Sequence, residues 1–458
     1  MSLSLGKGTE VWLSLSGMNP IRENWEGLLK LLLEPMARKP LEAFASEQRF
    51  QTVLEAMKRG LHNQLKSGPS AQASQRLWSA MTNQNPPLAE VIAAAESVSY
   101  AKLAAFLPKL FQEVSCEAFW YGQLSVHDAK DAWKLVKDTF TLNSKPLARE
   151  SVFHSLARAL PTTAVDGGKA APYIIPVSGK AKSGNSTMML MDFGWLDCRE
   201  KVALGILFKV LPNKFFEELR TKQQTGYVAS ASLTGMQRRS MALFTVVSAW
   251  CAPGDLLKRF EAFIESVSLG FIDPSNAKAV VVLTEKTFEM VRNSMLSSFK
   301  KPIQTIAEMS SMLQNIVMNF DGDFQVELKQ RTILQTVTLA EVKAVVHKVF
   351  HLGNKRRIAV LYAPEGAKHG LDMAPKAYTQ IDEKQLTQHY RNKASLEKGY
   401  GEFVKRPAYK CDVPTHNEQN RARDRELLIS AHETTLLDLE ELGEDFEGDG
   451  AGGAGGRR

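Results

Sequence analysis

Two of the nine histidines in this 458-residue chain have a spacing that metal ligands often use. His347 and His351 are four residues apart, so on a helix both imidazole rings would face the same side. The apolar spacing of residues 339–350 predicts a helix that ends there, just before a final strand. We therefore interpret the pair as surface or helix-end histidines and predict that this chain holds no metal.

The four cysteines have no short spacing between any two: they are Cys116, Cys198, Cys251 and Cys411. This scatter is neither a zinc knuckle nor a disulfide framework, and it predicts reduced thiols in a cytosol-like compartment. Residues 1–17 lack a basic segment followed by an apolar run, so they are not a secretory signal. No stretch approaches the roughly 20 apolar residues of a membrane helix. We predict a cytoplasmic protein without a membrane partner.

The net charge of +7 and the pI of about 9.0 raise the question of a nucleic-acid partner. The Lys and Arg residues are spread along the chain, however, and their longest run is near Lys355, Arg356 and Arg357. No basic helix and no aromatic-glycine signature of an RNA-binding sheet is found. A chamber that attracts acidic peptides would use the same surplus charge. We therefore predict no nucleic-acid partner.

The most specific local signal is the string FFEELRTKQQTGYV at residues 215–228. It resembles the segment of the insulysin/pitrilysin family of zinc peptidases in which a helix ending in Leu-Arg-Thr-Lys runs into a strand that begins Gly-Tyr. The string is long and contains rare neighbours, so a chance match is a poor explanation.

The resemblance continues on both sides of this string and covers roughly residues 9–365. At Gly122-Gln123 the chain departs from the family, which favours Gly-Asn there. Further matching segments are LPKLFQEVSCEAFWYGQLSVHDA at 107–129, Lys301-Pro302 with Glu308, and GNKRRIAVLYAP at 353–364. The match implies the C-terminal, non-catalytic half of such a peptidase.

The chemistry of the family requires zinc, held by the two histidines of an H-x-x-E-H helix and a later Glu. None of the nine histidines begins such a motif, and in the His347–His351 segment Phe350 stands where the general base should be. The resemblance therefore implies no catalytic and no metal-binding residue in this chain. Zinc is expected in a catalytic half located elsewhere.

What the resemblance carries over is a substrate-binding role for Arg220 and Tyr227. In the family these two residues reach across the chamber to the zinc site of the other half and bind the substrate backbone and the developing oxyanion. A fixed guanidinium and a phenol are donors suited to charge that grows in a transition state. Taken alone, the two residues would be an exposed helix-end Arg and an ordinary strand Tyr. We expect Gly226 to allow a sharp turn between helix and strand.

The elements that must position these residues indicate an α+β fold, because many helices and a few strands follow one another in irregular order. We expect Pro212-Asn213 to separate two helices and Asp255 to cap another. Helices are predicted at 21–39, 46–66, 72–82, 88–113, 126–136, 200–211, 214–222, from about 255, 274–298, 302–318 and 339–350. Strands are predicted at 9–15, 117–122, 187–196, 226–233, 241–250 and 357–362.

The resemblance implies two related domains, each a mostly antiparallel sheet with helices packed on it. The first begins at an internal strand, so it is expected to be N-terminally truncated, with an open sheet edge that a partner would cover. The division is 1–144 for the truncated domain, 145–186 for a linker with opening hairpins, 187–372 for the complete domain, and 373–458 for an extension with a disordered acidic and Gly-rich tail.

We thus expect this chain to supply substrate-binding residues that support the transition state to the zinc half of an insulysin-like metalloendopeptidase. Its partner would be a catalytic N-terminal half or a homologous subunit, its substrates unfolded or short peptides, and it would be inactive alone. The alternative is a non-enzymatic peptide-binding or assembly module of the same fold.

Overall fold

The computed structural model describes residues 2–5, 11–15, 22–38, 46–82, 85–110, 112–114, 116–141, 145–146, 157–158, 172–180, 184–236, 238–299, 301–381, 403–404 and 408–411. The chain forms two compact units. The larger comprises Met1–Ser14, Ala45–Ala104 and Val152–Cys411, and the smaller comprises Leu15–Phe44, Ala105–Ser151 and Asp412–Arg458. The four-part division expected from the sequence stays a prediction.

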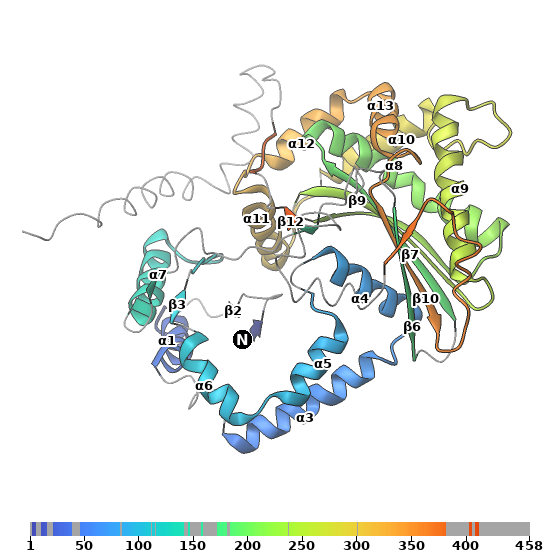
Figure 1. Ribbon diagram of the computed structural model, residues 1–458. Helices are drawn as coiled ribbons and strands as arrows, with labels where there is room; N and C mark the ends of the chain where they lie inside the picture. Colours follow the sequence, from blue (N-terminus) through green and yellow to red (C-terminus); the bar gives the residue numbers. More distant parts are fainter. Residues whose placement is uncertain are drawn as a thin grey trace, which may run out of the picture. The chain divides into compact units, whose positions relative to one another are not determined.

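A six-stranded sheet is the centre of the larger unit (Figure 1). Its strand order is β11-β6-β10-β7-β9-β8, with antiparallel pairs from β10 to β8 and parallel pairs at β6. The strands are β6 (Tyr173–Gly179), β7 (Asn185–Trp195), β8 (Val228–Met236), β9 (Arg239–Ser248), β10 (Arg357–Pro364) and β11 (Thr379–Gln380). The prediction of an α+β fold is confirmed.

Helices cover one face of this sheet and share with it the largest hydrophobic core (Figure 1). They are α8 (Cys198–Phe216), α9 (Pro253–Ile272), α10 (Glu285–Ser298), α12 (Val326–Thr336) and α13 (Leu339–Val349). Phe215 lies at the centre of this core, with its ring centroid 5.3 Å from that of Phe244 and 5.4 Å from that of Phe260. The segment that carries Arg220 therefore begins from a rigid, fully buried anchor.

The other face of the sheet is covered by α4 (Pro69–Met81), which lies against β10 and β7. Side chains of β10 alternate between the two cores: Ile358 and Val360 face α4, whereas Ala359 and Leu361 face the core of α8. This burial on both faces explains why β10 reads as an unbroken apolar run in the sequence.

The prediction of strands at 187–196, 226–233, 241–250 and 357–362 is confirmed, and so is the hairpin of β8 and β9. Most of the segment 145–186, where opening hairpins were expected, lies outside the described residues; in its described part β6 and β7 form no hairpin, because β10 lies between them. A strand from the C-terminal part of the domain thus inserts beside an early strand. Only tertiary packing sets this pairing, so local turn signals could not predict it.

Three expectations about helix ends are corrected. Pro212 does not divide two helices, since α8 runs through it. Leu211 and Phe215 are completely buried on either side, and burying them contributes about 2 kcal/mol each, which offsets the roughly 3 kcal/mol that an interior proline costs. Asp255 does not cap α9, which begins at Pro253 after the N-cap Ala252. The segment predicted as a helix from 274 is helical only as α10, whose N-cap is Thr284.

Other helices differ from the prediction in extent. The single helix expected at 88–113 is two, α5 (Leu88–Ser97) and α6 (Tyr100–Leu110), because Val98 is extended. Helix α11 (Ile306–Phe320) begins after a capping box of Thr305 and Glu308, four residues later than Pro302. Helix α12 was not predicted at all.

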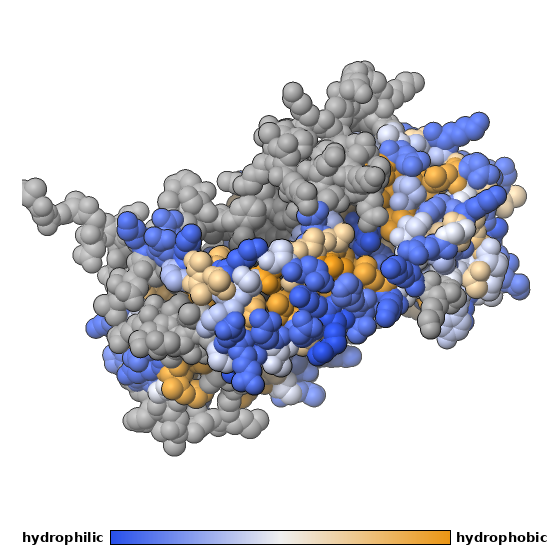
Figure 2. Space-filling model, turned by 60° about the horizontal axis from the view of Figure 1, so that its bottom comes forward, coloured by the Kyte–Doolittle hydropathy of each residue, from blue (hydrophilic) through white to orange (hydrophobic). Residues whose placement is uncertain are grey.

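Helix α3 (Glu47–Gln64) lies against α5, where Leu61 packs with Leu88 and Ala95. Val53 and Met57 of α3 stay exposed. Figure 2 looks at the molecule from below Figure 1 and shows hydrophobic residues gathered between hydrophilic ones on this face. None of the helices in the described part of the chain is by itself long and apolar enough to span a membrane; only α5 and α6 taken together meet that requirement, by length and composition.

The smaller unit contains α1 (Arg22–Arg38) and α7 (Val126–Thr141), which lie against each other, and a short pair of strands, β3 (Glu113–Val114) and β4 (Lys145–Pro146). The prediction of a strand at 117–122 is wrong, because these residues pair with no strand in the described part of the chain. At the start of the larger unit, β2 (Val11–Ser14) lies within the strand predicted at 9–15 and pairs with β1 (Ser2–Leu5). One large sheet is therefore described, not two.

The prediction of four reduced thiols is wrong for two of them. Cys198 and Cys411 form a disulfide with their Cα atoms 5.5 Å apart, although 213 positions separate them. Cys116 and Cys251 are free. The neighbouring Tyr409 ring packs into the hydrophobic cluster at α11, which holds the segment at 408–411 in place. The tail beyond Cys411 and its predicted disorder lie outside the described residues.

Candidate substrate-binding site

A change of helix type sets the position of Arg220. After Phe216, α8 continues as the π-helix η2 (Glu217–Lys222), in which the Gln223 N–H donates to the Glu218 carbonyl over 3.0 Å. Single π-turns within α-helices are rare and occur frequently at functional sites. Leu219 is completely buried, so the extra residue per turn rotates Arg220 to a partly exposed position while the helix stays anchored.

A tight turn then leads into β8. Gln224 has a positive φ of 50°, and the Thr225 N–H donates to the Leu219 carbonyl over 3.0 Å. A Cβ atom on Gly226 would lie 2.0 Å from the Val247 carbonyl oxygen of β9, so only glycine fits. Gly226 is therefore needed for the close approach to β9 and not, as expected, for the turn itself, where Gln224 has the positive φ. Tyr227 follows directly.

The Arg220 guanidinium lies between two aromatic rings. Its Cζ atom is 4.8 Å from the ring centroid of Phe216 and 4.7 Å from that of Tyr227. The three residues, here called the Arg220 stack, are brought together by the turn, since seven positions separate Arg220 from Tyr227. Cation–π contacts of this kind restrict the rotamers of a long side chain. Phe216 was not singled out from the sequence, although it lies within the matched string.

The stack lies at the surface of its unit. Tyr227 is 79% exposed, Phe216 is 38% exposed, and Arg220 is partly exposed. Among the described residues, neither the guanidinium of Arg220 nor the hydroxyl of Tyr227 forms a hydrogen bond or an ion pair. The stack therefore fixes the direction of a cation and leaves its N–H donors available to a ligand.

A second set of polar contacts holds the turn behind the stack. Gln223 donates to Glu218 over 3.0 Å and accepts from Arg259 of α9 over 3.0 Å, and Arg259 in turn donates to Asp255 over 2.8 Å. Burial acts to raise the pKa of Glu218, but hydrogen bonds from Gln223 and Lys222 outweigh it and leave this pKa below its usual value. Sequence reasoning missed this support, because it joins residues about 40 positions apart.

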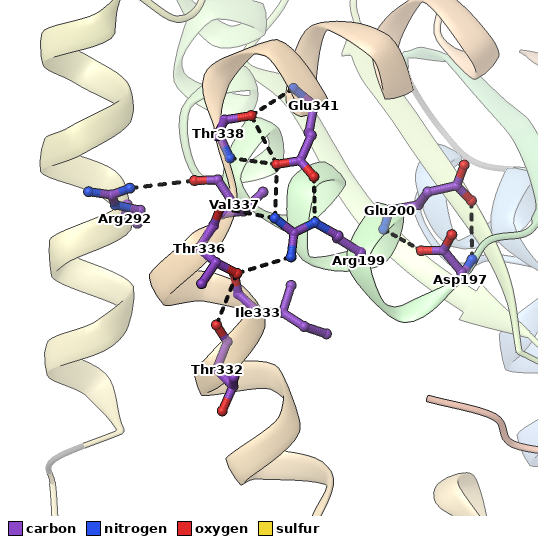
Figure 3. Close-up of polar contacts among 10 residues, drawn as sticks. All are labelled: Asp197, Arg199, Glu200, Arg292, Thr332, Ile333, Thr336, Val337, Thr338 and Glu341. Carbon is purple, nitrogen blue, oxygen red and sulfur yellow. Dashed lines mark hydrogen bonds and ion pairs between the residues drawn. The ribbon is translucent and has the colours of Figure 1, made fainter. Parts of the chain in front are cut away.

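The start of α8 is fastened to α12 and α13 (Figure 3). Arg199 donates to the Thr336 hydroxyl over 3.0 Å and to the Thr336 carbonyl over 2.9 Å, and it forms an ion pair with Glu341. Glu341 also accepts from the Thr338 N–H over 2.8 Å in a capping box. The hydrogen bond from Arg199 is the main cause that lowers the pKa of Glu341 to about 2. Both ends of α8 are thus fixed.

The two histidines with metal-ligand spacing do not share a helix face. α13 ends at Val349, so His347 lies on the helix and His351 lies beyond it. Phe350 is completely buried, with its ring centroid 6.2 Å from that of Phe193. The described residues contain no group of three or more His, Cys, Asp or Glu side chains that could hold a metal ion.

The run of three basic residues is not a cationic surface. Arg357 is buried and forms an ion pair with Glu261 over 2.5 Å. Arg356 is half-buried, and its burial lowers its pKa. Lys355 donates to the carbonyl of Leu352 over 3.2 Å. The run stabilises the end of α13 and the start of β10, so it gives no argument for a nucleic-acid partner.

Several known proteins, among them peptidases, are similar to this chain. Residues 206–314 match the family described as PQQ synthase PqqF-like, C-terminal lobe domain 4. Insulin-degrading enzyme of Homo sapiens is 24% identical over 321 residues, which is 68% of this chain and 29% of that protein. Insulin-degrading enzyme-like 2 of Arabidopsis thaliana is 23% identical over 264 residues, which is 58% of this chain and 26% of that protein. The crystal structure of pitrilysin has the same fold, with a TM-score of 0.63 at 14% identity, over 84% of this chain and 37% of pitrilysin.

The helix-covered sheet contains residues 206–314, the part of the chain that matches this C-terminal lobe domain. The chain is thus similar in sequence and fold to the C-terminal region of insulysin/pitrilysin-type peptidases, the resemblance that its sequence predicted. It spans less than a third of the length of the human and Arabidopsis relatives, at 29% and 26%.

Proposed function

We propose that this chain is the substrate-facing, non-catalytic part of a metalloendopeptidase and complements a zinc-containing half located elsewhere. The observation that carries the proposal is the Arg220 stack: a partly exposed guanidinium held between two rings, with no hydrogen-bond or ion-pair partner among the described residues. A partly exposed guanidinium that is held in place by two rings is positioned to donate hydrogen bonds to a ligand. Peptide carbonyl oxygens and carboxylates are such ligands.

The role of this chain in the reaction is to bind and orient. Arg220 and Tyr227 would donate hydrogen bonds to the backbone of the peptide and to the oxygen on which negative charge develops. Because Phe216 and the turn fix the guanidinium beforehand, little reorganisation is needed when the charge appears. Zinc, when bound in the other half, would supply the activated water. The described donor set of this chain does not fit a zinc site, and we derive no step on it.

The cellular location of the protein is a separate question. A cytoplasmic protein was predicted from the sequence, and it stays a prediction. The Cys198–Cys411 disulfide favours an oxidising compartment, since such bonds persist there and are rare in the cytosol.

The test is reconstitution with a purified catalytic half and a quenched fluorogenic peptide. We expect the wild-type chain to raise peptide hydrolysis, and Arg220→Ala to lose about 10²–10³ of that rise in kcat, as removal of one transition-state donor does. Lys209→Ala, which removes an exposed lysine of α8 from the same helix, is the matched control and should act like wild type. Hydrolysis that is the same with and without the chain would exclude the proposal.

A non-enzymatic peptide-binding module is the second candidate, and the exposed donors of the stack favour it equally. It predicts that the chain binds peptides through Arg220 but leaves the hydrolysis rate of every catalytic half unchanged. The same reconstitution separates the two.

A further inference from the structure

Strand β8 is the last strand of the six-stranded sheet. It pairs with β9 on one side, and no strand among the described residues pairs with its other side. Helix α8 and the π-helix η2 lie against it from one face only. Along these nine residues, every second one directs its backbone N–H and C=O to this outer edge, where no described strand pairs with them.

This edge lacks the features that usually prevent strand addition. The sequence of β8, VASASLTGM, has no charged residue and no proline. Ala229 and Ala231 are buried in the core of α8, whereas Val228, Ser230 and Ser232 are exposed on the opposite face, the one on which α4 covers β10 and β7. Small side chains on this face leave room for the side chains of a further strand. An edge of this length without protection is a template for pairing.

The edge begins next to the Arg220 stack, because Tyr227 immediately precedes β8. We infer that β8 binds an extended, neutral to acidic peptide as an added strand, whose carbonyl or carboxylate oxygen at the end nearest Tyr227 accepts from Arg220. This inference rests on the proposed function and specifies how the substrate is held. Backbone pairing gives affinity without demanding a particular sequence, and the stack fixes the register.

Charge argues for a peptide over a second copy of this chain. Arg220 has no acidic partner among the described residues, so its donors are available to an acceptor that the occupant brings. A second copy would bring the same surplus of seven positive charges, whereas a neutral or acidic peptide meets no such repulsion. Pairing between two β8 strands, or coverage of β8 by another segment of the chain, is therefore an outcome for the test.

The test uses the full chain and a fluorescein-labelled nonapeptide of Thr, Val and Gln residues, with affinity measured by fluorescence anisotropy. A set of peptides carries one N-methyl group each, moved along the backbone, which removes a single N–H donor. In an added strand every second N–H points to the neighbouring strand. We expect affinity to fall about fivefold at alternate positions and to be unchanged between them, since each backbone hydrogen bond is worth about 1 kcal/mol.

The arms of this experiment separate the inference from the proposed function. Binding that needs Arg220 but shows no period of two along the methylated peptides would overturn strand addition and leave the function intact. Binding that ignores Arg220→Ala while Lys209→Ala also has no effect would count against the function itself. A dimer in sedimentation that the peptide dissociates would show that β8 pairs with a second copy of the chain. A chain that binds no peptide would show that another segment of the same chain covers β8. Either result would make the inference wrong.

Discussion

Gly226→Ala tests whether the turn before β8 places the Arg220 stack. The added Cβ atom would lie 2.0 Å from the Val247 carbonyl oxygen and 3.1 Å from Ser248 Cα. A relaxed carbon–oxygen contact is about 3.3 Å or more, so the two strands must separate by about 1 Å there. Both obstructing groups are backbone, so no side chain can rotate away.

The magnitude follows from two effects. Overpacking of this kind costs about 1–3 kcal/mol, and separation of the first β8–β9 hydrogen bond adds about 1 kcal/mol. We expect the free energy of unfolding to fall by about 3 kcal/mol in urea titrations, and peptide affinity to fall because Tyr227 moves with the turn. Gly60→Ala is the matched control: Gly60 lies inside α3 with open space around it, so the change should stabilise by about 0.5–1 kcal/mol. A Gly226→Ala protein with the stability and peptide affinity of wild type would refute this account of the turn.

Three further predictions concern the framework around the site. The pKa of Glu341 is about 2, so its ion pair with Arg199 stabilises the fold above the ordinary pKa near 4.5 and loses this effect as pH falls toward 2. Because the carboxylate is about a third exposed, the contribution is small. We expect Glu341→Gln to remove about 1 kcal/mol of the pH dependence in acid titrations of unfolding. Asp192 is completely buried and forms an ion pair with Arg239 over 2.5 Å. Asp192→Asn leaves that arginine buried without its counter-charge, so the free energy of unfolding in chemical denaturation should fall by about 3–5 kcal/mol. A fall below about 1 kcal/mol would contradict the importance of the pair. Because the Cys198–Cys411 bond closes a long loop, Cys411→Ser should cost about 2–5 kcal/mol, and thiol titration of the denatured, unreduced wild type should give two reactive thiols; four would show that no disulfide forms.

The sequence predicted those parts of the fold in which local pattern and tertiary packing agree. β10 was predicted because both of its faces are buried, and the β8–β9 hairpin because two apolar runs flank a short turn. The pairing of β6 with β10 could not be read locally, since it joins residues about 180 positions apart. The predicted helix break at Pro212 was wrong because burial of the neighbouring side chains outweighs the tendency of proline to break a helix.

In the candidate site, too, some features were predicted from the sequence and others were not. Arg220 and Tyr227 were named from a resemblance, and the structure places their side chains in contact. The third member, Phe216, was not named from the sequence, although it lies four residues before Arg220, a spacing that places two side chains on one face of a helix. The Cys198–Cys411 bond was missed because its 213-residue separation carries no spacing signal.

Peptide affinity with and without the guanidinium tests the central claim most directly. Fluorescence anisotropy with one labelled extended peptide would compare wild type, Arg220→Ala and Lys209→Ala. We expect about a tenfold or greater loss of affinity for Arg220→Ala, in line with a charge-assisted hydrogen bond of about 1.5–3 kcal/mol, and no change for Lys209→Ala. Equal affinity of all three proteins would contradict the assignment of the Arg220 stack as a substrate-binding site.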